Sequence, residues 1–165
     1  MGTQSVEDFL TKQILIEGNI ITYRSLSRQL PSHVNAAKNA LATFHKKVRK
    51  EGEFKAFATY LVSGEIQLDI QEADTMITNV DIDEENIEYD DDGAEEVPLI
   101  EVVLVGEKDL ELTKSKFSTI HSIYIYSLSP APIIDMGLIC GHNEIVRDID
   151  NKKGTEMAAI AGKIV

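Results

Sequence analysis

Residues 20–64 hold the pattern that most restricts the fold of this 165-residue chain. Thr22 stands where it can cap a short helix that runs to Leu30, and Pro31 then breaks the chain. Residues 32–50 predict a second helix, with Ser32 as a suitable cap and Gly52 just beyond the end. Apolar residues recur in this helix at steps of three and four: Val34, Ala37, Leu41, Phe44 and Val48. We expect this stripe to be buried, which predicts two helices packed together.

A β-hairpin is expected directly after the helix pair. Phe57–Val62 is rich in strand-forming residues, and Ser63-Gly64 is typical of a tight turn into a second strand over Glu65–Ile70. Helix, turn, helix and hairpin in this order predict an α+β fold, a winged-helix variant. Domains of that kind bind DNA or another protein and seldom catalyse reactions.

The rest of the chain predicts further elements that would join the hairpin in a small mixed sheet. We expect residues 1–165 to form a single domain, since this length buries enough surface without disulfide bonds. The further elements are a helix over residues 5–17, strands over 99–105 and 120–128, a helix over 108–119 and a helix near 143–149.

The formal net charge of −12 is concentrated in one segment. Between Asp69 and Glu101 lie 14 of the 28 acidic residues, which leaves 14 acidic against 16 basic residues elsewhere. Residues 71–97 are too acidic and too poor in apolar side chains to form a packed structure, so we expect a disordered insertion between two strands. Such an arm would repel nucleic acid or dock on a basic partner.

Patterns for catalysis and metal binding are few. Cys140 and His142 are possible metal ligands close together, whereas a zinc site needs three or four. No glycine-rich loop ends in the Lys-Ser/Thr of a phosphate site, and no serine lies in a nucleophile elbow. We therefore expect no catalytic residue, no cofactor and no metal. A single cysteine fits a reducing compartment, and no apolar run is long enough to cross a bilayer, so we expect no membrane association.

DNA binding is the alternative function. In a winged helix, the second helix of the pair enters the major groove, with its N-terminal residues on base edges and basic residues on phosphates. The missing overall positive charge argues against this reading, so we expect little direct DNA binding. A DNA-binding regulator using the 32–50 helix would rely on His33, Asn35, Lys38, Asn39, Lys46, Lys47, Arg49 and Lys50.

Several strings, taken in order, resemble one known family. They are Ile20–Tyr23 with Leu26-Ser27, His33–Asn35 with Ala37-Lys38, Thr59–Gly64, Lys114–Lys116 and Ser122–Ser127. Each string is modest alone, but the ordered set over residues 14–130 resembles the N-terminal domain of the third, non-catalytic subunit of eukaryotic DNA polymerase delta. The resemblance implies a winged-helix variant that binds the second, small subunit, which carries an oligonucleotide-binding fold and an inactive phosphodiesterase domain.

The same resemblance implies a nuclear accessory subunit of DNA replication and repair, linked indirectly to the catalytic subunit and shared with DNA polymerase zeta. Members of the family continue into a charged tail that ends in a sliding-clamp-binding peptide, Gln-x-x-aliphatic-x-x-aromatic-aromatic. No glutamine of this chain is followed by that pattern. We therefore expect a fragment of a longer chain, with clamp binding in a tail absent here. The 71–97 insertion is also longer than the family resemblance leads us to expect.

The residues expected to contact the partner come from physical reasoning. Tyrosines are typical interface anchors. Tyr124 and Tyr126 should share one side of the 120–128 strand, and Tyr60 lies in the hairpin. Ile133 and Ile134 follow a Pro-Ala-Pro break, where apolar side chains should be exposed. The alternative is that these five residues pack the core of the domain itself.

Overall fold

The computed structural model describes residues 5–52, 54–66 and 98–162. Its helices and strands confirm the α+β class, whereas the acidic insertion predicted at 71–97 lies outside the described residues. In chain order the elements are α1 (Val6–Leu10) continued by the π-type turn η1 (Thr11–Ile16), β1 (Ile21–Thr22), α2 (Tyr23–Gln29), α3 (Val34–Glu51), β2 (Phe57–Ile66), β3 (Ile100–Gly106), the 3-10 turn η2 (Glu107–Asp109), α5 (Leu110–Lys114), β4 (Phe117–Ser129) and α6 (Gly137–Ala161).

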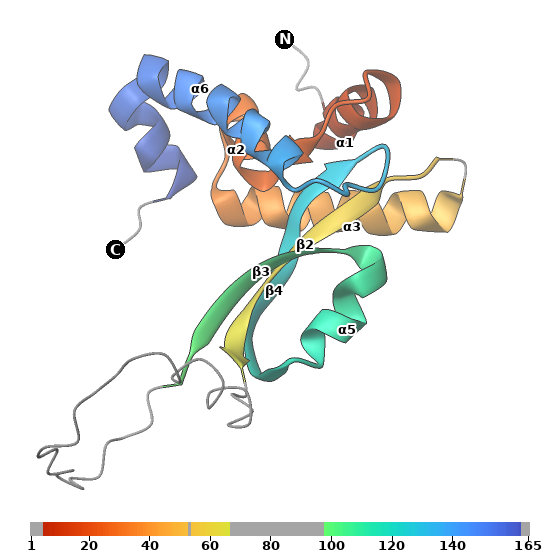
Figure 1. The fold of residues 1–165 in the computed structure, drawn as a ribbon. Coiled ribbons are helices and arrows are strands. Elements are labelled where there is room, and N and C mark those ends of the chain that lie inside the picture. Colours follow the sequence, from red (N-terminus) through yellow and green to blue (C-terminus); the bar gives the residue numbers. More distant parts are fainter. Residues whose placement is uncertain (1–4, 53, 67–97, 163–165) are drawn as a thin grey trace, which may run out of the picture.

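The four strands form one sheet in the order β1-β4-β2-β3, and every neighbouring pair is antiparallel. The prediction of a mixed sheet is therefore wrong. β3 and β4 do run parallel to each other, joined through α5, but β2 lies between them and takes the hydrogen bonds of both. Figure 1 shows α1, α2, α3 and α6 gathered around one end of the sheet, whereas α5 lies at the other.

The helix pair is confirmed, and its caps explain where α2 begins. The Thr22 side chain accepts a hydrogen bond from Ser25 N, and the Ser25 side chain accepts one from Thr22 N, each at 3.1 Å. In α3 the predicted stripe packs into the core together with Leu26. The cap of α3 is His33 instead of Ser32, because His33 Nδ1 accepts from Asn35 N at 3.1 Å while the Ser32 backbone bonds to Ser27.

The predicted turn at Ser63-Gly64 is wrong. β2 continues through both residues to Ile66 and pairs with β3 on one side and β4 on the other. A side chain at Gly64 would place Cβ 2.1 Å from the carbonyl oxygen of Thr119, at a register shift between β2 and β4. Glycine is thus needed for a close approach of two strands, and the predicted second strand reaches into residues 67–70, outside the described part of the chain.

Two other predicted helices have different bounds. The 108–119 helix shrinks to α5, because Phe117 begins β4 and pairs with Ile66. The 143–149 helix extends to Gly137–Ala161, with a break at Gly154, where φ is 48°. It packs on α2 through a few widely spaced buried side chains, Ile139, Val146, Met157 and Ala161. Such sparse burial is a weak periodic signal, which explains the short prediction.

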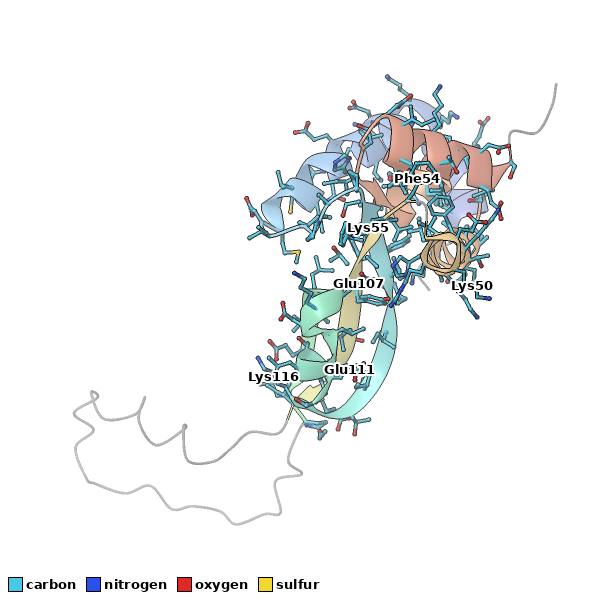
Figure 2. The ribbon with its side chains drawn as sticks, turned by 90° about the vertical axis from the view of Figure 1, so that its right-hand side faces the viewer. Lys50, Phe54, Lys55, Glu107, Glu111 and Lys116 are labelled. Carbon is cyan, nitrogen blue, oxygen red and sulfur yellow. The ribbon has the colours of Figure 1, made fainter. Side chains whose placement is uncertain are left out.

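One buried histidine joins α3 to η2, the turn that precedes α5. His45 is 5% exposed, and its Nε2 lies against Oε1 of Glu107, which Figure 2 shows between α5 and α3. Burial lowers the pKa of His45 from its ordinary 6.5, with Arg49 adding to the shift and Glu107 opposing it. The folded protein therefore favours the neutral imidazole.

This histidine should make stability depend on pH. Because the folded pKa lies below the unfolded one, its contribution is complete above pH 6.5 and is lost as the pH falls towards the folded pKa. We expect His45→Gln to flatten the decline of the unfolding free energy below pH 6.5. Urea unfolding at a series of pH values measures this, and identical slopes for both proteins would contradict the assignment.

Candidate functional site

Three tyrosines form a cluster where α2 meets β4. The rings of Tyr124 and Tyr126 both stand edge-on to Tyr23, with centroid distances of 5.6 and 5.4 Å. Tyr23 is 7% exposed, and the two others are half-buried. Burial raises the pKa of the Tyr124 hydroxyl to about 12, with Tyr23 adding to the shift, and burial also raises the pKa of Tyr126. These hydroxyls are therefore neutral at physiological pH and unsuited to acid–base work.

Two cations cover this tyrosine cluster. The Lys38 ammonium lies 3.6 Å from the ring centroid of Tyr124 and 4.9 Å from that of Tyr23. Arg24 Nε donates a hydrogen bond to the Tyr23 hydroxyl at 3.1 Å, and this bond raises the pKa of the guanidinium. The cluster thus presents positive charge at its surface while its rings are packed inside.

Beside these cations lies a cavity of about 640 Å³. Its walls come from α2, the first turns of α3, residues 143–150 of α6 and Gly162 just beyond the end of α6, so we call it the α2–α3–α6 cavity. The Arg28 guanidinium spans it at one side, donating to the two Asp150 oxygens at 3.0 and 3.3 Å. The remaining lining side chains include Arg24, Lys38 and Arg147.

The structure does not bring the five predicted contact residues together. Tyr124 and Tyr126 do meet, through Tyr23, which the sequence reasoning did not single out. Tyr60 pairs with Ile125, and therefore points to the opposite side of the sheet from Tyr124, which pairs with Leu61. Burial, followed by the nearby Glu107 carboxylate, raises the pKa of Tyr60. Ile133 and Ile134 lie between β4 and α6, where Ile134 is 95% exposed and Ile133 is half-buried.

One side of the sheet leaves apolar side chains uncovered. The pairing register places residues of β3, β2 and β4 on this side, and the contact between the Ser63 and Ser122 hydroxyls at 2.7 Å agrees with it. Ile100 is 58% exposed and Val102 61%, on a strand that pairs along one edge only within the described sheet. We call this surface the open sheet face; its apolar and aromatic members are Leu61, Ile100, Val102, Leu104 and Tyr124, beside the polar Ser63, Glu65 and Ser122.

The other side of the same strands is covered around Val62 and Val105, whereas Ile123, which pairs with Val62, is 42% exposed there. Val62 is fully buried and Val105 is 6% exposed, and both point away from the open sheet face. The sequence of β3 has apolar residues on both sides of the strand, with Ile100, Val102 and Leu104 on one side and Val103 and Val105 on the other. That pattern predicts a strand buried on both sides. The sequence does not reveal that Ile100 and Val102 remain exposed on one of these sides.

Of the eight residues proposed for DNA contact, two are held by contacts within the domain, and two others, His33 and Asn35, lie in a cavity wall. Lys38 lies on the tyrosines, and Lys47 forms an ion pair with Glu7 at 2.7 Å. Asn35 lies in the wall of the α2–α3–α6 cavity, next to α6. Four of the other proposed residues have exposed side chains on α3: Asn39, Lys46, Arg49 and Lys50. Because α6 flanks the N-terminal end of α3, this end could not enter a DNA groove by itself.

Within residues 5–52, 54–66 and 98–162, no three potential ligands among His, Cys, Asp and Glu come close enough to hold a metal ion. Cys140 is exposed in this part of the chain, and burial lowers the pKa of His142. The helices that the structure describes include none with the length and hydropathy of a membrane span.

Comparison with known proteins identifies relatives. Residues 19–165 match the family described as DNA polymerase subunit Cdc27. The chain is 30% identical over 156 residues to DNA polymerase delta subunit 3 of Chaetomium thermophilum, an alignment that covers 92% of this chain and 34% of that protein. It is 30% identical over 135 residues to the proteins of the same name from Gallus gallus and Homo sapiens, covering 81% of this chain and 23% and 22% of theirs. The chain thus spans about a third or less of the length of these relatives.

Proposed function

This chain belongs to the family of the DNA polymerase subunit Cdc27, and we propose that it is the partner-binding domain of a non-catalytic accessory subunit of DNA polymerase delta. The partner we propose is the second, small subunit of that polymerase, through which the domain would tether the rest of its own chain to the catalytic subunit. The place of action would be the nucleus, in DNA replication and repair. The same pair would also serve DNA polymerase zeta.

The observation that carries this proposal is the open sheet face. Ile100 and Val102 expose most of their apolar surface side by side on one strand, with Leu104 and Leu61 continuing the patch. Burying apolar surface contributes about 25 cal/mol per Å², so covering this patch supplies a substantial driving force for association. A protein partner of matching shape covers such a face more completely than a polar, highly charged nucleic acid does.

The tyrosine cluster supports the same face. Tyr124 belongs to the open sheet face through its neighbour Leu61, and its ring is held rigid by Tyr23 and Lys38. A rigid, half-buried tyrosine at the border of an apolar patch is a typical anchor for a protein interface. Tyr60 points to the other side of the sheet, so we assign it to the interior of the domain and leave it out of the proposed contact.

We further propose that the fold is a winged-helix variant. The α2–α3 pair followed by the antiparallel β2–β3 pair supports this classification. A DNA-binding role for α3 is less well supported, because Lys38 and Lys47 serve other contacts and α6 flanks the N-terminal turn.

The experiment that tests the proposed function is co-expression with the small subunit of DNA polymerase delta, followed by size-exclusion chromatography. We expect a 1:1 complex that stays together at 0.5 M salt, because an apolar interface depends little on ionic strength. Random-sequence duplex DNA at physiological salt should bind far more weakly. Absence of a complex, combined with tight DNA binding that falls steeply with salt, would favour the alternative instead.

A further inference from the structure

The α2–α3–α6 cavity concentrates positive charge in a protein whose net charge is −12. Four of its lining residues are Arg or Lys, contributed by three different helices, whereas Asp150 is the one carboxylate among them. That carboxylate is already held by Arg28, which donates to both of its oxygens. Arg24, Lys38 and Arg147 form no ion pair with any other described residue, so the cavity carries about three uncompensated positive charges.

The charge of this cavity suits an anion with more than one negative charge. Arg24 comes from α2, Lys38 from α3 and Arg147 from α6, so three helices contribute positive charge to its wall. A carboxylate has two oxygens and a single charge, whereas a phosphate monoester has three free oxygens and a charge near −2. Arginine forks pair with such oxygens through two parallel hydrogen bonds. The positive end of the α3 dipole adds to the same field.

The surroundings disfavour nucleic acid as the source of the phosphate. A single strand needs exposed aromatic rings on which bases stack. Here Tyr23 is 7% exposed, and the face of Tyr124 is occupied by Lys38. The major groove of duplex DNA is about 12 Å wide and admits one helix of about 10–12 Å diameter. Because α6 stands beside the N-terminal turn of α3, two helices would have to enter together.

We propose that the α2–α3–α6 cavity binds the phosphate group of a phosphoserine or phosphothreonine in a peptide of a partner protein. Arg24 and Arg147 hold the phosphate oxygens. Lys38 supplies the third charge from its ammonium, which lies over rings of the tyrosine cluster. Lys38 joins this site to Tyr124 at the border of the open sheet face, so phosphorylation of such a partner would add a second contact beside the apolar one. Clusters of arginines are a recurrent solution for phosphopeptide recognition.

The test uses the isotope-labelled 165-residue protein and a capped five-residue peptide of glycines around one phosphoserine. Titration followed by ¹H–¹⁵N NMR should move the backbone signals of the α3 N-terminal turn and of the α6 turn that carries Arg147. We expect the same peptide with unmodified serine to bind at least tenfold more weakly. Glutamate in place of phosphoserine should also lose at least tenfold.

Charge-removing variants test the residue assignment. Arg24→Gln combined with Arg147→Gln should weaken phosphopeptide binding at least tenfold. Arg147→Gln alone should weaken phosphopeptide binding at least threefold. Arg147 is exposed on α6, so this single variant keeps the test valid if the double variant folds poorly. The control removes the same charge elsewhere, with Lys46→Gln and Lys50→Gln on the exposed side of α3, and should leave binding within twofold.

Three outcomes would overturn the proposal. Equal binding of the serine and phosphoserine peptides would remove any role for phosphate. Equal binding of the glutamate peptide would make the cavity a general acidic-peptide site. Tighter binding of an oligothymidylate with the same NMR shifts would assign it to nucleic acid. None of these measurements uses a polymerase subunit, so their failure leaves the proposed function untouched.

Discussion

Replacing Gly64 with alanine should destabilise the protein by about 3 kcal/mol or more, a large share of the stability of a domain this size. The new Cβ would lie 2.1 Å from the Thr119 carbonyl oxygen and 3.0 Å from both Ile120 Cα and a ring carbon of Phe117. Two of these three atoms belong to the backbone, so no side-chain rotation relieves the contact. β2 and β4 must therefore move apart at the centre of the sheet.

Gly106→Ala is the matched control. Gly106 also lies in the sheet, opposite Thr59, and its backbone angles of −73° and 164° are open to any residue. A Cβ built there meets nothing within 4 Å, so we expect a change within about 0.5 kcal/mol. Urea unfolding of both variants measures the difference. If Gly64→Ala proved as mild as Gly106→Ala, the strand would not continue through residue 64 and the predicted turn would be restored.

The part of the fold that local chemistry controls could be predicted. The cap at Thr22 and the stripe of α3 each depend on residues a few positions apart, and both are observed. The same applies to the positive φ of Gly18 and Gly52 at helix ends. Local signals failed where a distant strand decides the outcome. Ser63-Gly64 has the composition of a turn, yet the close approach of β4 is what requires the glycine.

The end of α5 shows the same limit. The 108–119 stretch has helical apolar spacing, but Phe117 pairs with Ile66 in the antiparallel sheet. Phenylalanine and the following β-branched residues favour strands once a partner strand is available. The helical spacing of apolar residues predicts a helix to residue 119, but the pairing of β4 with ten residues of β2 outweighs that local preference.

For the candidate site, the residue type predicts which side chains are suited to an interface, but the sequence does not predict where these side chains lie in the fold. Tyr124 and Tyr126 were chosen because tyrosines anchor interfaces, and they do lie together. Their partner Tyr23 lies about a hundred residues earlier in the chain, and only the fold brings it to β4. Tyr60 was chosen on the same ground, but the β2 register places it on the other side of the sheet. The α2–α3–α6 cavity is lined by residues 143–150 of α6, close to the helix predicted near 143–149, but the sequence does not reveal that this helix packs on α2.

Val102→Lys should weaken binding of the small polymerase subunit at least thirtyfold, a loss of about 2 kcal/mol at an interface anchor. Val102 is 61% exposed on β3, so the substitution should change the stability of the fold little. Edge strands also tolerate lysine. In the complex the ammonium would have to be buried against apolar surface or displace the partner. Alanine at Tyr124 is a poorer probe, because its ring also holds Tyr23 and Lys38 in place.

Leu112→Lys supplies the control for this prediction. Leu112 is equally apolar and 65% exposed, but it lies on α5, outside the open sheet face. We expect the dissociation constant of Leu112→Lys for the small subunit to lie within twofold of that of the unchanged protein. Titration calorimetry measures the affinity of both variants at a temperature at which both are folded. If Leu112→Lys lost affinity and Val102→Lys kept it, the contact would lie on the α5 side. The open face would then need a different partner, because an apolar strand left uncovered promotes aggregation.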